Sequence, residues 1–151
     1  MFIKESELFK GMSQEFMNEL AKIMVEESYE KGTFLFKETD SANAFYVLEE
    51  GRVRLSVGTQ GHIVYILTDP GDALGWSSLV GRDTYTASAE CLAQSKLIKI
   101  EREKLDKIFE KHLADGALFF KRLAGLIGQR LINSYNSLLS SQRKEDQPSY
   151  G

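Results

Sequence analysis

Short stretches of alternating polarity, punctuated by glycine from about Glu27 to Ile100, constrain the fold of this chain most. The clearest is Arg52 to Val57, where aliphatic residues alternate with polar ones. A period of two is typical of a strand with one buried and one solvated face. Turn sequences such as Gly58-Thr59-Gln60-Gly61 separate these stretches at intervals that favour an antiparallel sandwich or barrel. The pattern therefore predicts a small jelly roll over about residues 27–100.

Strands and helices follow one another in a simple order. The expected strands are Thr33 to Phe36, Phe45 to Leu48, Arg52 to Val57, Ile63 to Leu67, Thr84 to Cys91 and Lys96 to Ile100. Apolar residues at helical spacing predict helices at Ser13 to Val25, with Ser13 as N-cap, at Arg102 to Phe109, and at about 117–141. We therefore expect one mainly β domain over residues 1–141, and a disordered polar tail over residues 142–151.

The long C-terminal helix carries an apolar stripe that is too wide for a solvated helix. Its seam steps by four and three residues, as in a heptad pattern, through Phe120, Ala124, Ile127, Leu131, Ser134 and Leu138. Phe119, Leu123 and Leu126 widen the stripe, so one side can pack on the barrel while the other meets a second copy. We predict a homodimer with Phe120, Ile127, Leu131 and Leu138 at its interface.

Composition excludes several classes of partner. The formal net charge is −3 and the pI is near 5.5, with both signs interspersed, which argues against direct contact with nucleic acid. Cys91 is the only cysteine, so no disulfide framework is available, and this fits a reducing compartment. No stretch approaches the roughly 20 apolar residues of a membrane span, and the start lacks a signal-peptide core. We expect a cytoplasmic protein without membrane contact.

The sequence offers no constellation that is typical of catalysis. His62, in a turn, and His112, near a helix end, are the only histidines, and both are expected at the surface. A metal enzyme on a jelly roll would need clustered histidines and carboxylates. No nucleophile with a nearby base, paired carboxylates or glycine-rich mononucleotide loop stands out. We predict that the protein is not an enzyme and holds no metal or organic cofactor.

The segment from Asp69 to Cys91, here called the cassette, has the features of an anion-binding loop. It opens with the turn Asp69-Pro70-Gly71-Asp72, in which proline and glycine fix the dihedrals. Gly75 through Val80 is expected to form one short helical turn, whose exposed amides can hold a negative charge. From Thr84 the residues alternate as in a half-buried strand.

These elements, in this order, resemble the cyclic-nucleotide-binding domain of catabolite-activator-type regulators, kinase regulatory subunits and gated channels. The matching stretches are Leu8-Phe9 before Met12-Ser13, Lys31-Gly32, Phe45 to Leu48, Glu50 to Val53, and Pro70-Gly71-Asp72 leading to Gly75. The resemblance covers roughly Leu8 to Leu139. It implies an antiparallel β jelly roll (a double-stranded β-helix) between an N-terminal helix and a long C-terminal helix, with a regulatory role in signal transduction.

Two departures from the family pattern lie inside the cassette. Members that bind cyclic AMP or cyclic GMP typically have a glutamate for the ribose hydroxyl and an arginine for the cyclic phosphate, where this chain has Trp76 and Tyr85. A hydrogen bond to a charged group contributes roughly 1.5–3 kcal/mol, so losing two would weaken binding by roughly two to four orders of magnitude. Ordinary recognition of cyclic AMP or cyclic GMP is therefore not expected. A smaller mismatch is Thr39, where the family often has glycine.

Some capacity to bind an anion is still expected. The predicted ligand site comprises Gly75, Trp76, Ser77, Ser78, Arg82, Tyr85 and Thr86, with Arg130 and Ser134 from the long helix. Each has a structural alternative. Trp76 and Tyr85 form either an aromatic floor for a planar ligand or a plug. Arg82 either replaces the missing guanidinium or points into water, Arg130 binds a ligand or flanks the helix in solvent, and Ser77 and Ser78 contact a ligand or cap a turn.

Two functional hypotheses follow from these residues. In the first, the chain is a regulatory module that senses a small nucleotide-like or other anionic ligand in the barrel and signals through its C-terminal helix. In the second, the pocket is plugged, and the fold is a ligand-free scaffold for dimerisation or for docking a partner protein.

Overall fold

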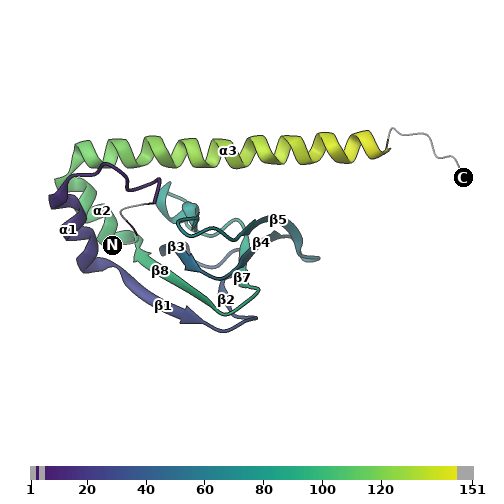
Figure 1. Ribbon diagram of the computed structural model, residues 1–151, viewed down its shortest axis with the longest axis horizontal. Helices are drawn as coiled ribbons and strands as arrows, with labels where there is room; N and C mark the ends of the chain where they lie inside the picture. The colour runs from purple at the N-terminus through teal and green to yellow at the C-terminus, as the bar shows by residue number, and fades with distance from the viewer. Residues whose placement is uncertain (1–2, 4–5, 146–151) are drawn as a thin grey trace, which may run out of the picture.

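The described part of the chain folds into two antiparallel four-stranded sheets that form a jelly roll (Figure 1). The computed structural model describes residue 3 and residues 6–145. The sheets have the strand orders β1-β8-β3-β6 and β2-β7-β4-β5. The strands are β1 (Val25–Tyr29), β2 (Phe34–Phe36), β3 (Ala44–Glu50), β4 (Val53–Val57), β5 (His62–Leu67), β6 (Ala73–Leu74), β7 (Ser88–Cys91) and β8 (Ser95–Glu101). The predicted fold class is confirmed.

Strands β1 and β6 were not predicted from the sequence, and β7 is shorter than predicted. Glutamates interrupt the alternation in β1, an edge strand that pairs with β8 alone, and β6 has only two residues. Regular pairing in the stretch predicted from Thr84 begins at Ser88. The reason is that the preceding residues bond to the loop between β2 and β3, where the Tyr85 amide donates to the Asp40 carbonyl at 2.9 Å.

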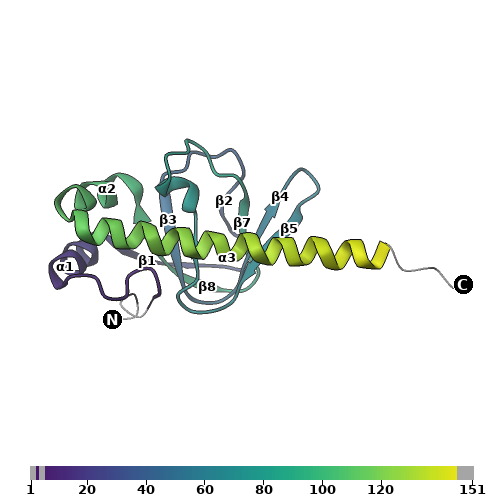
Figure 2. The same cartoon turned by 90° about the horizontal axis from the view of Figure 1, so that it is seen from above.

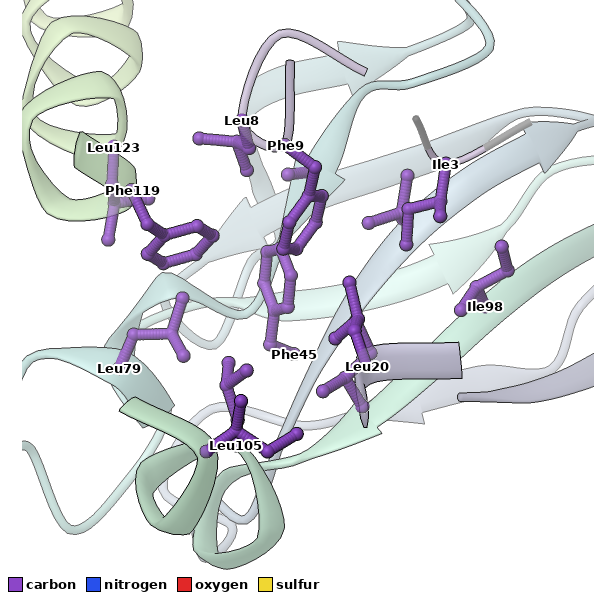
Figure 3. Packing of buried hydrophobic residues seen from close by; sticks show 14 of the residues in the cluster. Ile3, Leu8, Phe9, Leu20, Phe45, Leu79, Ile98, Leu105, Phe119 and Leu123 are labelled. Carbon is purple, nitrogen blue, oxygen red and sulfur yellow. The ribbon is translucent and has the colours of Figure 1, made fainter. Parts of the chain in front are cut away.

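Strand β3 separates two hydrophobic clusters. Ala44, Tyr46 and Leu48 belong to the cluster between the sheets, whereas Phe45 and Val47 belong to the cluster on the helix side. Figure 3 shows the helix-side cluster, where the Phe119 ring lies beside Phe45. These two rings meet edge to face, with centroids 6.2 Å apart. Such aromatic pairs stabilise by about 0.5–1.5 kcal/mol beyond their burial, so they fix the start of the long helix on the barrel.

In the described part of the chain, three α-helices flank the sheets: α1 (Gln14–Ile23), α2 (Arg102–Lys111) and α3 (Leu113–Glu145). The predicted cap is confirmed, since the Ser13 hydroxyl accepts from the Phe16 amide at 3.2 Å. Helix α3 exceeds its predicted range at both ends, and residues 142–145, expected to be disordered, continue it. Residues 146–151 of the predicted tail lie outside the described residues. His112 is not a plain surface residue, because its Nε2 lies 2.6 Å from the Glu19 carboxylate.

Helix α3 runs across the barrel and extends well past it (Figures 1 and 2). Every side chain from 131 to 142 is exposed, including Leu131 at 50% and Leu138 at 68%. The other two predicted interface residues contact this chain's own core. The Phe120 ring lies 5.2 Å from that of Phe109, and Ile127 packs on the helix-side cluster. The stripe therefore divides into a packed first half and an open second half.

Candidate functional site

The cassette leaves the sheet at a position that only glycine fits. Strand β6 pairs with β3 through Leu74 and Tyr46, and then Gly75, at φ +85°, turns the chain into the 3-10 turn η2 (Trp76–Leu79). A Cβ at this position would lie 2.9 Å from the Ala44 carbonyl oxygen. Both the positive φ and the close approach exclude other residues. The helical turn predicted here is confirmed, in 3-10 form.

Tyr85 lies beside Ala44 of β3, in the space left where the chain turns away from the sheet at Gly75. Its hydroxyl accepts from the Ala44 amide at 3.1 Å and donates to the Ala44 carbonyl at 2.5 Å. Its ring stacks on Phe36, with centroids 3.7 Å apart, and the residue is 5% exposed. Burial raises the pKa of Tyr85, while the hydrogen bond to Ala44 and the charge of Arg102 act in the opposite direction. Tyr85 is therefore part of the barrel wall.

The cavity beside the cassette is almost closed. Its volume is about 20 Å³, and it is lined by Phe36, Leu55, Gly75, Trp76, Ser77, Tyr85, Thr86 and Ala87. A single water needs roughly 10–15 Å³, whereas pockets for organic ligands measure roughly 300–1,000 Å³. A nucleotide would fit only if Tyr85 moved out of the wall.

Two main-chain donors at the start of η2 nevertheless remain available. Within the described residues, the amides of Trp76 and Ser77 have no hydrogen-bond acceptor. The Ser77 hydroxyl lies 3.4 Å from that of Thr86, and both residues line the small cavity. Ser78 is fully buried, and its hydroxyl donates to the Gly75 carbonyl at 2.7 Å, which favours the capping interpretation for this residue. The geometry thus leaves two amides without an acceptor but provides no room for an organic ligand beside them.

Trp76 lies between the small cavity and the helix-side cluster. It is half-buried, lines the small cavity, and packs against the helix-side cluster. Its indole therefore supports η2 from outside the barrel, whereas the phenol of Tyr85 closes the inside.

Three predicted site residues lie away from the cassette cavity. Arg82 is exposed in the loop after η2, and Ser134 is exposed on α3, where its hydroxyl donates to the Arg130 carbonyl at 3.1 Å. Arg130 is neither at the cavity nor solvated. Its guanidinium donates to the Ala73 carbonyl at 2.5 Å and lies 4.8 Å from the centroid of the Tyr65 ring. Burial lowers the pKa of Arg130. This arginine ties α3 to the strand that opens into η2.

Sequence reasoning missed the partners that define this geometry. Phe36 and Ala44 hold Tyr85, and Ala73 and Tyr65 hold Arg130. All four partners are far along the chain from the residue that they hold. No local pattern signals such contacts. Over the residues that the structure describes, no three His, Cys, Asp or Glu side chains gather as a possible metal site. Within the same residues, no helix is both long and apolar enough to cross a membrane. The cytoplasmic location stays a prediction.

Comparison with known proteins agrees with this fold. The model of the cyclic nucleotide-binding domain family matches residues 26–112. A provisionally named cyclic nucleotide-binding protein from Geobacter metallireducens has a structure with a TM-score of 0.77, at 27% identity, covering 85% of this chain and 95% of that one. The catabolite activator protein of Thermus thermophilus gives a TM-score of 0.71 at 24% identity, covering 91% of this chain and 63% of that one.

Among curated proteins, a cGMP-dependent protein kinase of Drosophila melanogaster (isozyme 2 forms cD5/T2) is 23% identical over 129 residues. The match covers 78% of this chain but only 14% of the kinase. The chain therefore spans about a seventh of the length of that relative.

Proposed function

The chain belongs to the cyclic nucleotide-binding domain family, and on that premise we propose that it is a regulatory domain whose cassette does not recognise cyclic AMP or cyclic GMP in the usual manner. The observation that carries the proposal is the cavity of about 20 Å³, closed by a tyrosine whose hydroxyl is bound to Ala44. The resemblance to nucleotide-binding members implies charged anchors at the positions of Trp76 and Tyr85, and both are absent. The role is one of binding and regulation and not of catalysis, in keeping with a family of binding domains.

Helix α3 is the output element in this proposal. Phe119 and Leu123 anchor its first half in the helix-side cluster, and Arg130 bonds to the Ala73 carbonyl at the start of the cassette. A change at η2 would therefore reach α3 through this hydrogen bond and through the helix-side cluster, which Leu79 of η2 shares with Phe119 and Leu123. A ligand can drive such a change only if it distinguishes two positions of the helix. A cassette ligand would be a small anion held by the Trp76 and Ser77 amides after Tyr85 has moved.

Calorimetric titration of the wild-type protein with cyclic AMP and cyclic GMP tests the proposal. We expect no saturable binding below about 100 µM. The double variant Trp76→Glu/Tyr85→Arg restores both charges and removes the phenol, so its affinity should rise by roughly two orders of magnitude or more. A denaturant titration shows that the variant folds. Saturable binding of either nucleotide to the wild type would reject the closed cassette. If the variant folds but binds neither nucleotide, something other than Trp76 and Tyr85 prevents binding.

A second function, homodimerisation, is supported by the open half of α3. Leu131 and Leu138 are largely exposed, as is every side chain from 131 to 142. An apolar stripe of this kind is costly to leave in water, and a two-fold pairing of helices would cover it. Docking of a different protein on the same stripe is the alternative.

A further inference from the structure

A much larger cleft lies next to the closed cassette. It has a volume of about 520 Å³ and is bounded by β2, the loop between β2 and β3, the end of β8 and the first turn of α2. We call it the barrel-end cleft. Phe36 and Tyr85 line this cleft as well as the small cassette cavity, so their stacked rings form a wall between the two. The cleft is within the size range of sites for organic ligands, roughly 300–1,000 Å³.

The floor of the barrel-end cleft is made by aromatic side chains. Phe36, Tyr46 and Tyr85 line it. Tyr46 is only 4% exposed, and within the described residues its hydroxyl makes no hydrogen bond. Within the same residues no fully buried side-chain oxygen lacks a partner, so the Tyr46 oxygen keeps contact with solvent, where a ligand group can reach it. Phe36, Tyr46 and Tyr85 are 4–6% exposed, so a flat ring would pack against the small area that they expose, with the hydroxyl as a polar contact.

Two cations on the wall of the cleft have unused bonding capacity. Lys99 and Arg102 both line it. Within the described residues, Lys99 has no carboxylate within 4 Å, and the guanidinium of Arg102 reaches only the Arg82 carbonyl, at 3.5 Å. Asp106, one helical turn beyond Arg102, is outside ion-pair distance. These two side chains can therefore accept a negative group from a ligand.

The carboxylates of the cleft are differently engaged. Glu101 pairs with Lys104 at 3.2 Å, and one oxygen of Asp40 accepts from the Lys37 amide at 2.9 Å. Glu103 is exposed in the first turn of α2, where the helix dipole favours a negative charge. Glu101 and Asp40 thus have local partners, whereas neither Lys99 nor Arg102 is paired with a carboxylate.

We propose that the barrel-end cleft binds a small molecule that combines a planar ring with one carboxylate or phosphate group. The ring lies on the floor made by Phe36, Tyr46 and Tyr85, and the anionic group lies between Lys99 and Arg102. A planar guanidinium beside a flexible ammonium suits either anion. The cleft and the cassette cavity share only Phe36 and Tyr85 among their lining residues, so each site can be tested by itself.

An NMR titration of the full chain tests this proposal with four probes. Adenosine 5′-monophosphate and benzoate carry both a ring and an anion, adenosine lacks the anion, and inorganic phosphate lacks the ring. We expect saturable shifts with one or both of the first two, at a dissociation constant below about 1 mM, in residues 40–46 and 99–103. Lys99→Gln and Arg102→Gln should each weaken that binding roughly tenfold, the loss expected for one charged hydrogen bond.

Matched variants separate a site from a general charge effect. Lys107→Gln and Arg82→Gln remove charges from exposed side chains that do not line the cleft, so they should leave affinity unchanged. The proposal is overturned if neither anionic ring compound binds, if adenosine binds as tightly as its monophosphate, or if Lys99→Gln and Arg102→Gln have no effect. Shifts confined to the cassette amides of Trp76 and Ser77 would reject both the cleft and the closed cassette. Absence of any shift would reject the cleft alone.

Discussion

Replacing Tyr85 with phenylalanine should destabilise the domain although the ring and its volume are kept. The hydroxyl is the partner of both backbone groups of Ala44, with distances of 3.1 Å to the amide and 2.5 Å to the carbonyl oxygen. Strand β6 has already turned away at Gly75, so no other strand can take these bonds. Ala44 is 3% exposed, and its amide and carbonyl would remain buried without a partner.

The size of the effect follows from that loss. An unpaired buried donor or acceptor costs about 1–3 kcal/mol. Ala44 and Tyr85 also line the barrel-end cleft, from which a water can recover part of the loss. We therefore expect the free energy of unfolding to fall by about 2–3 kcal/mol when both hydrogen bonds to Ala44 are lost. In a domain of this length that corresponds to a fall in Tm of roughly 4–12 °C.

Urea unfolding followed by far-UV circular dichroism measures this change, with the slope checked so that only the midpoint moves. Tyr135→Phe is the matched control, because Tyr135 is 52% exposed on α3 and its hydroxyl has no hydrogen bond in the described part of the chain. The control should change stability by less than about 0.5 kcal/mol. If Tyr85→Phe were as mild as Tyr135→Phe, Tyr85 would not be a structural part of the wall, and the closed-cassette proposal would lose its basis.

Two further predictions concern α3. The double variant Leu131→Glu/Leu138→Glu should be monomeric by sedimentation while the wild type is dimeric, with Asn136→Glu, off the seam, as control; a monomeric wild type contradicts the helix pairing. Arg130→Met should lower stability by about 1–3 kcal/mol, because it removes the bond to the Ala73 carbonyl. The same variant should speed hydrogen exchange in the second half of α3, whereas Lys121→Met should not; unchanged protection would show that Arg130 does not hold the helix.

The sequence predicted the parts of the fold that rest on local periodicity. Val53 and Leu55 are buried as their alternation required, because a strand exposes every second side chain to one face. Gly71 has the positive φ that its position in the turn suggested. Strand β1 was beyond the same reasoning, since its burial is decided by pairing with β8 and its glutamates hide the alternation.

The site was only partly predictable, because it depends on contacts between distant segments. The sequence left Tyr85 open between a floor and a plug, and its contacts with Phe36 and Ala44 favour the plug. For Arg130, helical spacing gives a face but not the rotation of α3 about its axis, so the bond to Ala73 could not be read in advance. The barrel-end cleft is lined by residues from β2, β3, β8 and α2 and from nearby loops, and no local motif predicts it.

The energetics of Tyr85 also decide where a ligand signal can enter this domain. A ligand at the Trp76 and Ser77 amides must first displace Tyr85, and the estimated 2–3 kcal/mol for its bonds to Ala44 alone would weaken apparent affinity roughly 30- to 150-fold. The missing charged anchors add to that loss. A ligand in the barrel-end cleft faces no such barrier, because the space is already open and Phe36 and Tyr85 line it in their present positions. Binding there would favour the closed arrangement of the cassette, and hence the position of α3 that Arg130 fixes through Ala73.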